Sequence, residues 1–292
     1  MYRSARPLEL ALWQYHFENA GADRVLHALS FYQNEDGGFG HALEADSRNP
    51  LSSPLTTQTA TEILYAVDAL RTHPLVQNTL RYLDSGAHFD AAQRQWLNCV
   101  PGNNDAPHAI WWHYRDGGDA FSYNPTAALA GFILRYGEKG SPVYEKGLAI
   151  AREAADWYLS GQGRGEKHVL HCFVRLAQFC EGHDVPRLGQ LRAALHEEMQ
   201  RCICTDLSKY GVEYVDRPTD LIDGPAHPYY PDMAGAADAE CQFLLDSQLA
   251  DGSWPVPWTW CNGYKEFEVA ANWWKGHIVL KHILYLRNFG KL

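Results

Sequence analysis

The chain has 292 residues, 46% hydrophobic and 21% charged, a composition typical of a globular protein with a sizeable core. Its formal net charge of −10 argues against a nucleic-acid-binding surface and, less strongly, against a large polyphosphate partner. No run approaches the ~18 consecutive apolar residues of a transmembrane segment. The N-terminus also lacks the apolar stretch of a signal peptide.

The cysteines indicate a cellular compartment. There are seven, an odd number, and no two form a Cys-x-x-Cys pair. Reduced thiols in a cytoplasmic protein are the simplest account of this pattern. Cys202 and Cys204 are two residues apart, and on a helix such side chains diverge, so we expect them to be structural.

Aromatic residues are the unusual part of the composition. The chain carries 10 Trp, 16 Tyr and 11 Phe, which together make up 13% of it. This surplus indicates that some aromatic side chains line a functional cavity as well as filling the core.

Apolar periodicity predicts helices along most of the chain. The expected helical segments are 8–19, 23–32, 55–72, 74–83, 124–136, 142–159, 166–181, 187–204, 232–247 and 270–289. Strand signals are scarce, so we expect the all-α class. The long connections at 41–54, 86–123, 205–231 and 254–267 are candidates for function, because long loops inside a compact domain usually have one.

Two stretches near opposite ends of the chain share one pattern, which is Gln, three residues, Gly, one residue and an aromatic. They are Gln33–Phe39 and Gln248–Trp254, and weaker echoes occur at Gln93–Trp96 and Gly161–Gly163. The Gln can bond backbone groups left unpaired at a helix end, the Gly supplies a positive φ, and the ring packs over the junction. Recurrence of such a mark at helix ends indicates a helical repeat.

The pattern Gln-x-x-x-Gly-x-Trp/Phe resembles the repeat of the terpenoid cyclase and protein prenyltransferase superfamily, which includes the squalene–hopene cyclases. The resemblance implies an α/α toroid, a barrel of inner and outer helices with the active site at its mouth and centre. We therefore expect a single α/α-toroid domain over residues 1–292, built from five to six helical hairpins. In that family the repeat has a structural role and is not the catalytic motif.

Carboxylates that follow the first motif are the candidate acid. Glu44 and Asp46 lie in a loop that a toroid would place at the barrel mouth. A carboxylic acid beside apolar and aromatic walls has its pKa raised by desolvation and can hold a proton near neutrality. We expect Glu44 or Asp46 to be the general acid, with His41 and Asp232 completing the catalytic set. The alternative is that these carboxylates cap turns in a solvated loop.

Aromatic and imidazole side chains of the other long loops are expected to bind the substrate. They are His108, Trp111, Trp112, His113, Tyr229, Tyr230, Trp254 and Trp258. Aromatic faces can stabilise the cation that forms when an alkene is protonated. Taken one at a time, each of these rings is also explained by packing in the core or at its rim.

The chain departs from the family in its motifs. Class II terpene cyclases carry Asp-x-Asp-Asp, and protein prenyltransferases hold zinc with Asp-x-Cys and a distant His, but neither string occurs here. An aspartate-rich magnesium site is also missing. We expect no cofactor. A divalent metal remains an alternative, with candidate ligands His41, Glu44, Asp46, His108, His113, His227 and Asp232.

Three functions are therefore open. The first is a terpenoid-cyclase-like or prenyl-substrate-handling enzyme, which takes a small hydrophobic substrate into an aromatic-lined central cavity. The second is a carbohydrate-active α/α-toroid hydrolase or lyase with a sugar-like substrate. The third is a toroid that binds a partner without catalysis. Family analogy places the first ahead of the others.

Overall fold

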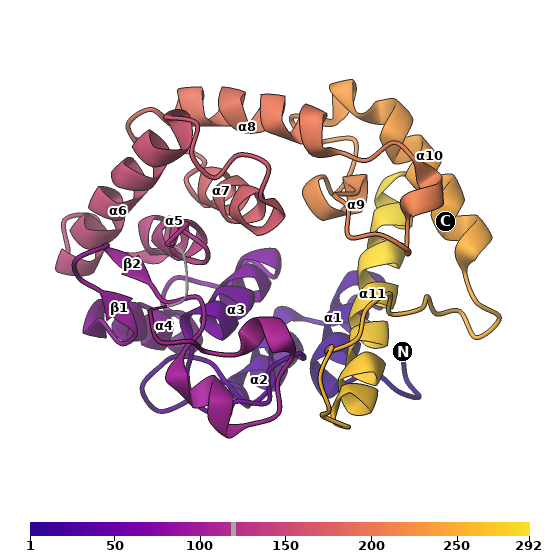
Figure 1. Cartoon of the computed structure of the whole chain (residues 1–292), viewed down its shortest axis with the longest axis horizontal. Helices are drawn as coiled ribbons and strands as arrows, with labels where there is room; N and C mark the ends of the chain where they lie inside the picture. Colours follow the sequence, from indigo (N-terminus) through magenta and orange to yellow (C-terminus); the bar gives the residue numbers. More distant parts are fainter. Residues whose placement is uncertain (118–120) are drawn as a thin grey trace. The chain divides into compact units, whose positions relative to one another are not determined.

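The computed structural model describes residues 1–117 and 121–292, and this part of the chain is mostly helical (Figure 1). Its α-helices are α1 (Pro7–Phe17), α2 (Ala22–Ser30), α3 (Pro54–Ala66), α4 (Pro74–Ser85), α5 (Thr126–Tyr136), α6 (Pro142–Leu159), α7 (Lys167–Phe179), α8 (Leu188–Cys202), α9 (Pro218–Leu221), α10 (Ala234–Ser247) and α11 (Phe267–Asn288). The all-α class is confirmed. None of these helices is long and apolar enough to cross a membrane.

The two longest connections contain short elements that the sequence did not predict. Strands β1 (Phe89–Asp90) and β2 (Gln95–Trp96) form an antiparallel hairpin. Short 3₁₀ helices that the sequence did not predict also lie in or next to these connections. They are η1 (Pro101–Asp105), η2 (Ile110–Trp112), η3 (Leu207–Lys209) and η4 (Tyr230–Asp232). Elements of two to five residues complete too little of a period to be read from apolar spacing.

The chain divides into two compact units, which we describe separately. Unit 1 comprises Met1–Gly21, His196–Thr259 and Lys265–Leu292. Unit 2 comprises Ala22–Leu195 and Trp260–Tyr264, so the boundary falls inside the sequence of α8. The closed toroid and its single-domain extent remain predictions.

Unit 2 is built around α5. Every residue of this helix is buried except Arg135, which is half-buried. A helix that is apolar on all sides must be covered on all sides, and α5 packs against α3, α4, α6 and α7 (Figure 1). Gly131 permits the approach of α7, because a Cβ there would lie 3.0 Å from Leu176 Cα.

Unit 1 is built around α11, which packs against α1, α9 and α10. The guanidinium of Arg6 lies over the Trp273 ring, 5.3 Å from its centroid, and also pairs with the buried carboxylate of Glu9. Arg287 donates to the carbonyl oxygen of His16 near the end of α1. These contacts bring the first and last helices of the chain together.

The first Gln–Gly motif forms a corner between α2 and α4. Gln33 Nε2 donates to the carbonyl oxygens of Gly37 and Leu75, both at 3.1 Å, and Gln33 Oε1 accepts from Asn78 Nδ2 at 3.2 Å. Gly37 has φ +94°, and a Cβ at this position would lie 2.1 Å from Asn78 O. Phe39 is completely buried. The corner therefore needs all three residue types of the motif.

The second motif forms a corner of the same kind between α10 and α11. Gln248 Nε2 donates to Gly252 O at 3.0 Å, and Gly252 has φ +80°. The buried Trp254 donates its indole N–H to Leu244 O at 3.1 Å, and its ring meets His282 of α11 edge to face. The positive φ of the Gly and the packing of the aromatic ring are confirmed in this corner too. The predicted role of the Gln differs, because Gln33 and Gln248 each bond the carbonyl of the glycine in their own turn, which lies outside the helices.

The two corners share hydrogen bonds that the sequence pattern did not include. An aspartate precedes each glycine, and its carboxylate accepts from the backbone N–H two residues on, at 2.9 Å for Asp36 and 3.0 Å for Asp251. The backbone pairs also correspond, since Asn34 N donates to Gly38 O as Leu249 N donates to Ser253 O. The echo at 161–163 is different, because Gln162 is exposed and donates to Ser160 Oγ.

These contacts predict that Gln33→Leu lowers the free energy of unfolding by about 1–3 kcal/mol, because the Gly37 carbonyl and the Asn78 amide each lose a hydrogen-bond partner. The matched control is Gln162→Leu, which should change it by no more than about 0.5 kcal/mol. Urea denaturation followed by circular dichroism measures both. Equal losses in the two variants would show that the corner bonds are not what matters.

Candidate acid–base sites

Three separate stretches of unit 2 meet in one hydrogen-bonded arrangement. Ala109 N donates to Asp46 O at 2.8 Å, and Arg48 N donates to Pro107 O at 2.9 Å. Ile110 N donates to Trp260 O at 3.1 Å. Two of the long loops predicted from sequence are thus joined to each other and to a short stretch near the C-terminus.

The side chain of Asp46 is buried within this arrangement. Its residue is 3% exposed, and Oδ1 accepts the indole N–H of Trp260 at 2.7 Å. Trp260 is 1% exposed. Burial favours the protonated carboxyl, whereas a hydrogen bond from the indole favours the carboxylate. Both forms of Asp46 therefore have a physical reason to exist in this setting.

Next to Asp46, two imidazoles are hydrogen-bonded to each other. His108 is buried, and its Nε2 lies 3.1 Å from His113 Nδ1, with the rings stacked at 5.3 Å. His108 Nδ1 lies 2.6 Å from the carbonyl oxygen of Ala106. Because a carbonyl only accepts, Nδ1 of His108 carries the proton, and in the neutral ring Nε2 accepts from His113.

The side chain of Tyr264 lies near both His108 and Trp260. The Tyr264 ring lies 5.6 Å from the His108 ring and 6.4 Å from the Trp260 ring. We call Asp46, His108, His113, Trp260 and Tyr264 the loop cluster. His113 is half-buried and Tyr264 is exposed, so the loop cluster extends from a buried carboxyl to the surface of unit 2.

The remaining predicted residues of unit 2 lie in more local settings. His41 is exposed, and its Nε2 bonds Asn34 Oδ1 at 2.8 Å within the first corner. Glu44 Oε1 accepts the backbone N–H of Asp46 at 3.2 Å. Trp111 is 41% exposed, while Trp112 is half-buried. The structure thus joins the loop of Asp46 to the loop of His108 and His113, whereas His41 bonds the first corner.

In unit 1 the predicted Asp232 pairs with a histidine that sequence reasoning missed. Asp232 Oδ2 lies 2.8 Å from His196 Nε2, and both side chains are partly exposed. The His196 ring stacks on Tyr229 at 4.7 Å, and the His227 ring meets Tyr229 edge to face at 5.3 Å. We call Asp232, His196 and Tyr229 the His196 site. His196 lies on a helix, away from any loop signal, and no spacing in the sequence marks it.

The 2.8 Å contact between Asp232 and His196 is one of charge proximity, because His196 Nε2 makes no hydrogen bond within the described residues. Asp232 therefore does not fix the tautomer of the His196 ring.

The other predicted residues of unit 1 differ in character. Tyr230 packs on Phe289, with ring centroids 5.5 Å apart, and Trp254 belongs to the second corner. These two have structural contacts. Trp258 is half-buried, and its ring meets the Trp274 ring at 5.2 Å.

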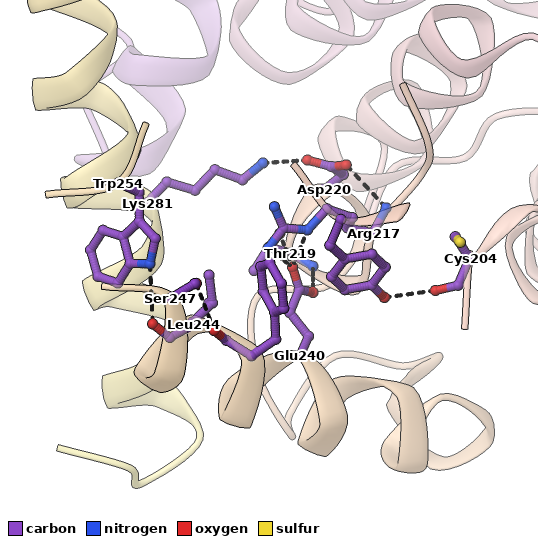
Figure 2. Close-up of polar contacts among 11 residues, drawn as sticks. Cys204, Arg217, Thr219, Asp220, Glu240, Leu244, Ser247, Trp254 and Lys281 are labelled. Carbon is purple, nitrogen blue, oxygen red and sulfur yellow. Dashed lines mark hydrogen bonds and ion pairs between the residues drawn. The ribbon is translucent and has the colours of Figure 1, made fainter. Parts of the chain in front are cut away.

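Unit 1 also contains a buried ion pair, which Figure 2 shows in detail. Glu240 is completely buried, and its carboxylate accepts from Arg217 Nε at 2.7 Å and from Thr219 N and Oγ1 at 2.7 and 2.8 Å. The Arg217 guanidinium lies over the Tyr210 ring at 4.7 Å. Burial raises the pKa of Glu240, and Arg217 opposes that rise. Through these hydrogen bonds Glu240 holds the stretch around Arg217 and Thr219 against α10.

A further ion pair joins the same stretch to α11. Asp220, which follows directly on the bonded Thr219, accepts from Arg217 N and from Lys281 Nζ (Figure 2). One short stretch around α9 is therefore tied to both α10 and α11. Removing one partner of such a buried pair costs far more than removing an exposed pair.

Within residues 1–117 and 121–292, no group of three or more His, Cys, Asp or Glu side chains is placed to hold a metal ion. None of the seven cysteines forms a disulfide in the part of the chain that the structure describes.

Comparison with protein-family models, with curated proteins and with solved structures finds no match to this chain. The geometry of the sites themselves therefore has to carry the functional interpretation.

The buried His282 predicts a pH dependence of stability. Burial lowers the pKa of His282 well below its usual value, and its Nδ1 has no hydrogen-bond partner among the described residues. Below about pH 6.5 His282 is protonated in the unfolded chain but stays neutral in the native protein. The free energy of unfolding therefore falls as the pH falls. The slope should reach about 1.4 kcal/mol per pH unit.

Urea titrations between about pH 7 and pH 5 test this linkage. In His282→Gln that part of the slope should disappear, and in His277→Gln, which changes an exposed histidine on the same helix, it should persist. An unchanged slope in His282→Gln would contradict the assignment.

Proposed function

We propose that the chain is a terpenoid-cyclase-like α/α-toroid enzyme that takes a small hydrophobic, prenyl-like substrate and protonates it through a carboxylic acid. The observation that carries this proposal is the buried Asp46, whose carboxyl accepts the indole N–H of Trp260 and whose backbone is bonded to the loop that carries the two imidazoles. The two Gln–Gly corners with matching bonds support the toroid.

Asp46 is a better acid candidate than Glu44. The Asp46 residue is 3% exposed, and burial favours the neutral acid, whereas Glu44 is only half-buried. In the proposed step its O–H proton passes to an alkene carbon, the π electrons form the new C–H bond, and a carbocation remains. The rings of Trp260 and Tyr264 would stabilise that cation by cation–π attraction. A proton lost from the product would restore the acid.

The His196 site favours a second candidate function, that of a carbohydrate lyase. His196 Nδ1 would remove the proton next to the carboxylate of a uronate ring, and the Tyr229 hydroxyl would protonate the leaving oxygen as the C–O bond breaks. The supporting observation is the partly exposed Asp232–His196 pair stacked on Tyr229.

Asp46→Asn tests the first proposal. On a linear isoprenoid that the parent protein converts, we expect this variant to lose about 10²–10⁴-fold in turnover, because it removes the acid. Glu44→Gln is the matched control and should stay within a factor of about three. Products are followed by gas chromatography with mass detection, and circular dichroism checks the fold. An Asp46→Asn variant as active as the parent would refute this role.

The same experiment separates the second candidate. If the parent cleaves a uronate polymer, the new conjugated double bond is seen by ultraviolet absorbance. His196→Gln should abolish that signal, while Asp46→Asn should leave it unchanged. A parent protein that converts neither class of substrate would favour the non-catalytic alternative.

A further inference from the structure

The stretch Trp260–Tyr264 of unit 2 contains the one Asn-Gly pair of the sequence, Asn262-Gly263. Such a pair is typical of a turn. The structure places both residues at the surface, outside any helix or strand. A Cβ added at Gly263 would meet no atom of the described residues within 4 Å. The pair is therefore exposed to water, with open space beside the glycine.

The side chain of Asn262 makes two hydrogen bonds. Its Nδ2 donates to the carbonyl oxygen of the buried His108 at 2.7 Å, and its Oδ1 accepts from Tyr264 N at 3.2 Å. The first bond joins the 260–264 stretch to the backbone of the loop cluster. The second closes a ring of atoms that includes the Gly263 nitrogen, so the side-chain amide is folded back toward that nitrogen.

These positions suit the loss of the side-chain amide from Asn262. The Gly263 nitrogen attacks Asn262 Cγ, a C–N bond forms, and ammonia leaves with the proton of the attacking N–H. Water then opens the cyclic imide at either carbonyl, which gives aspartate or isoaspartate. Glycine favours the attack, because it has no Cβ to crowd the nitrogen and its backbone turns freely.

The Gly263 N–H is also available as the nucleophile. Among the residues that the structure describes, it donates to no acceptor, so no hydrogen bond has to break before it attacks. The other asparagines of the chain are each followed by a residue that is larger than glycine. Asn262 therefore differs from them in the residue that follows it.

We propose that Asn262 is a site of spontaneous deamidation, and that the modification releases the 260–264 stretch from the loop cluster. The carboxylate that forms cannot donate, so the bond to His108 O is lost and two accepting oxygens face each other. Ile110 N, which donates to Trp260 O at 3.1 Å, makes the next bond between the same two stretches. The modification is separate from both proposed reactions and does not depend on either.

Peptide mass spectrometry of the full chain, stored folded at mildly alkaline pH and then digested at acid pH, tests the modification. We expect the peptide that contains Asn262 to gain about 1 Da, partly as isoaspartate. Asn104 is the internal control, because it is exposed and its side chain also bonds the backbone at both ends, to Tyr114, but Asp105 follows it. No gain at Asn262, or an equal gain at Asn104, would overturn the proposal.

Gly263→Ala tests the attacking group. The added Cβ has room in the fold, but it crowds the nitrogen, so deamidation of Asn262 should be at least about 5-fold slower than in the parent. Circular dichroism checks that the variant is folded. A folded variant that deamidates at the parent rate would refute attack by the Gly263 nitrogen.

Asn262→Asp tests the structural effect, because it carries the carboxylate from the start. The amide of Ile110 should exchange its hydrogen at least about 10-fold faster than in the parent, while amides of α5 keep their rates. Asn288→Asp is the matched control, since it removes a bond of the same kind, to Asp223 O in unit 1, and should leave Ile110 exchange within about 2-fold of the parent. Unchanged exchange at Ile110 in Asn262→Asp would show that the Asn262 bond does not hold the stretch, which would overturn the proposed release.

Discussion

The constraint on which the rest of the structure depends is the hydrogen bond from a glutamine amide to the carbonyl four residues later, closed over a glycine. Gln33 and Gln248 both make this bond, at 3.1 and 3.0 Å. At Gly37 a side chain is excluded twice, by the positive φ and by the Asn78 carbonyl. The loop leaving each helix is thus fixed over several residues.

Much of the fold follows from local rules and could be predicted. Helix spans, the glycine φ and the bond from each Gln to the glycine four residues on depend on residues within a few positions of each other. The bonds of Gln33 to Leu75 and Asn78 do not, and no local pattern predicts them. The β1–β2 hairpin and α9 could not be predicted, because two to four residues carry no usable period. The site divides in the same way. Asp46 and His108 could be proposed from their loops, but the partner of Asp46 is Trp260, 214 residues away, and no spacing connects them.

The carboxylates show how setting decides what one chemical group does. Glu240 is saturated by an arginine, a backbone N–H and a hydroxyl, so it holds secondary structure together. Asp46 is 3% exposed, and its Oδ1 accepts a hydrogen bond from the indole of Trp260. Asp232 is partly exposed and lies 2.8 Å from His196 Nε2.

Amide hydrogen exchange tests the corner constraint most directly. The N–H groups of Asn34, Gly37, Leu249 and Gly252 lie outside helices, yet each donates to a backbone carbonyl inside its corner. The account predicts that they exchange as slowly as amides in the helices that they join. Exchange at the rate of exposed loops, in either corner, would mean that the glutamine bonds do not hold the chain there and would contradict the account.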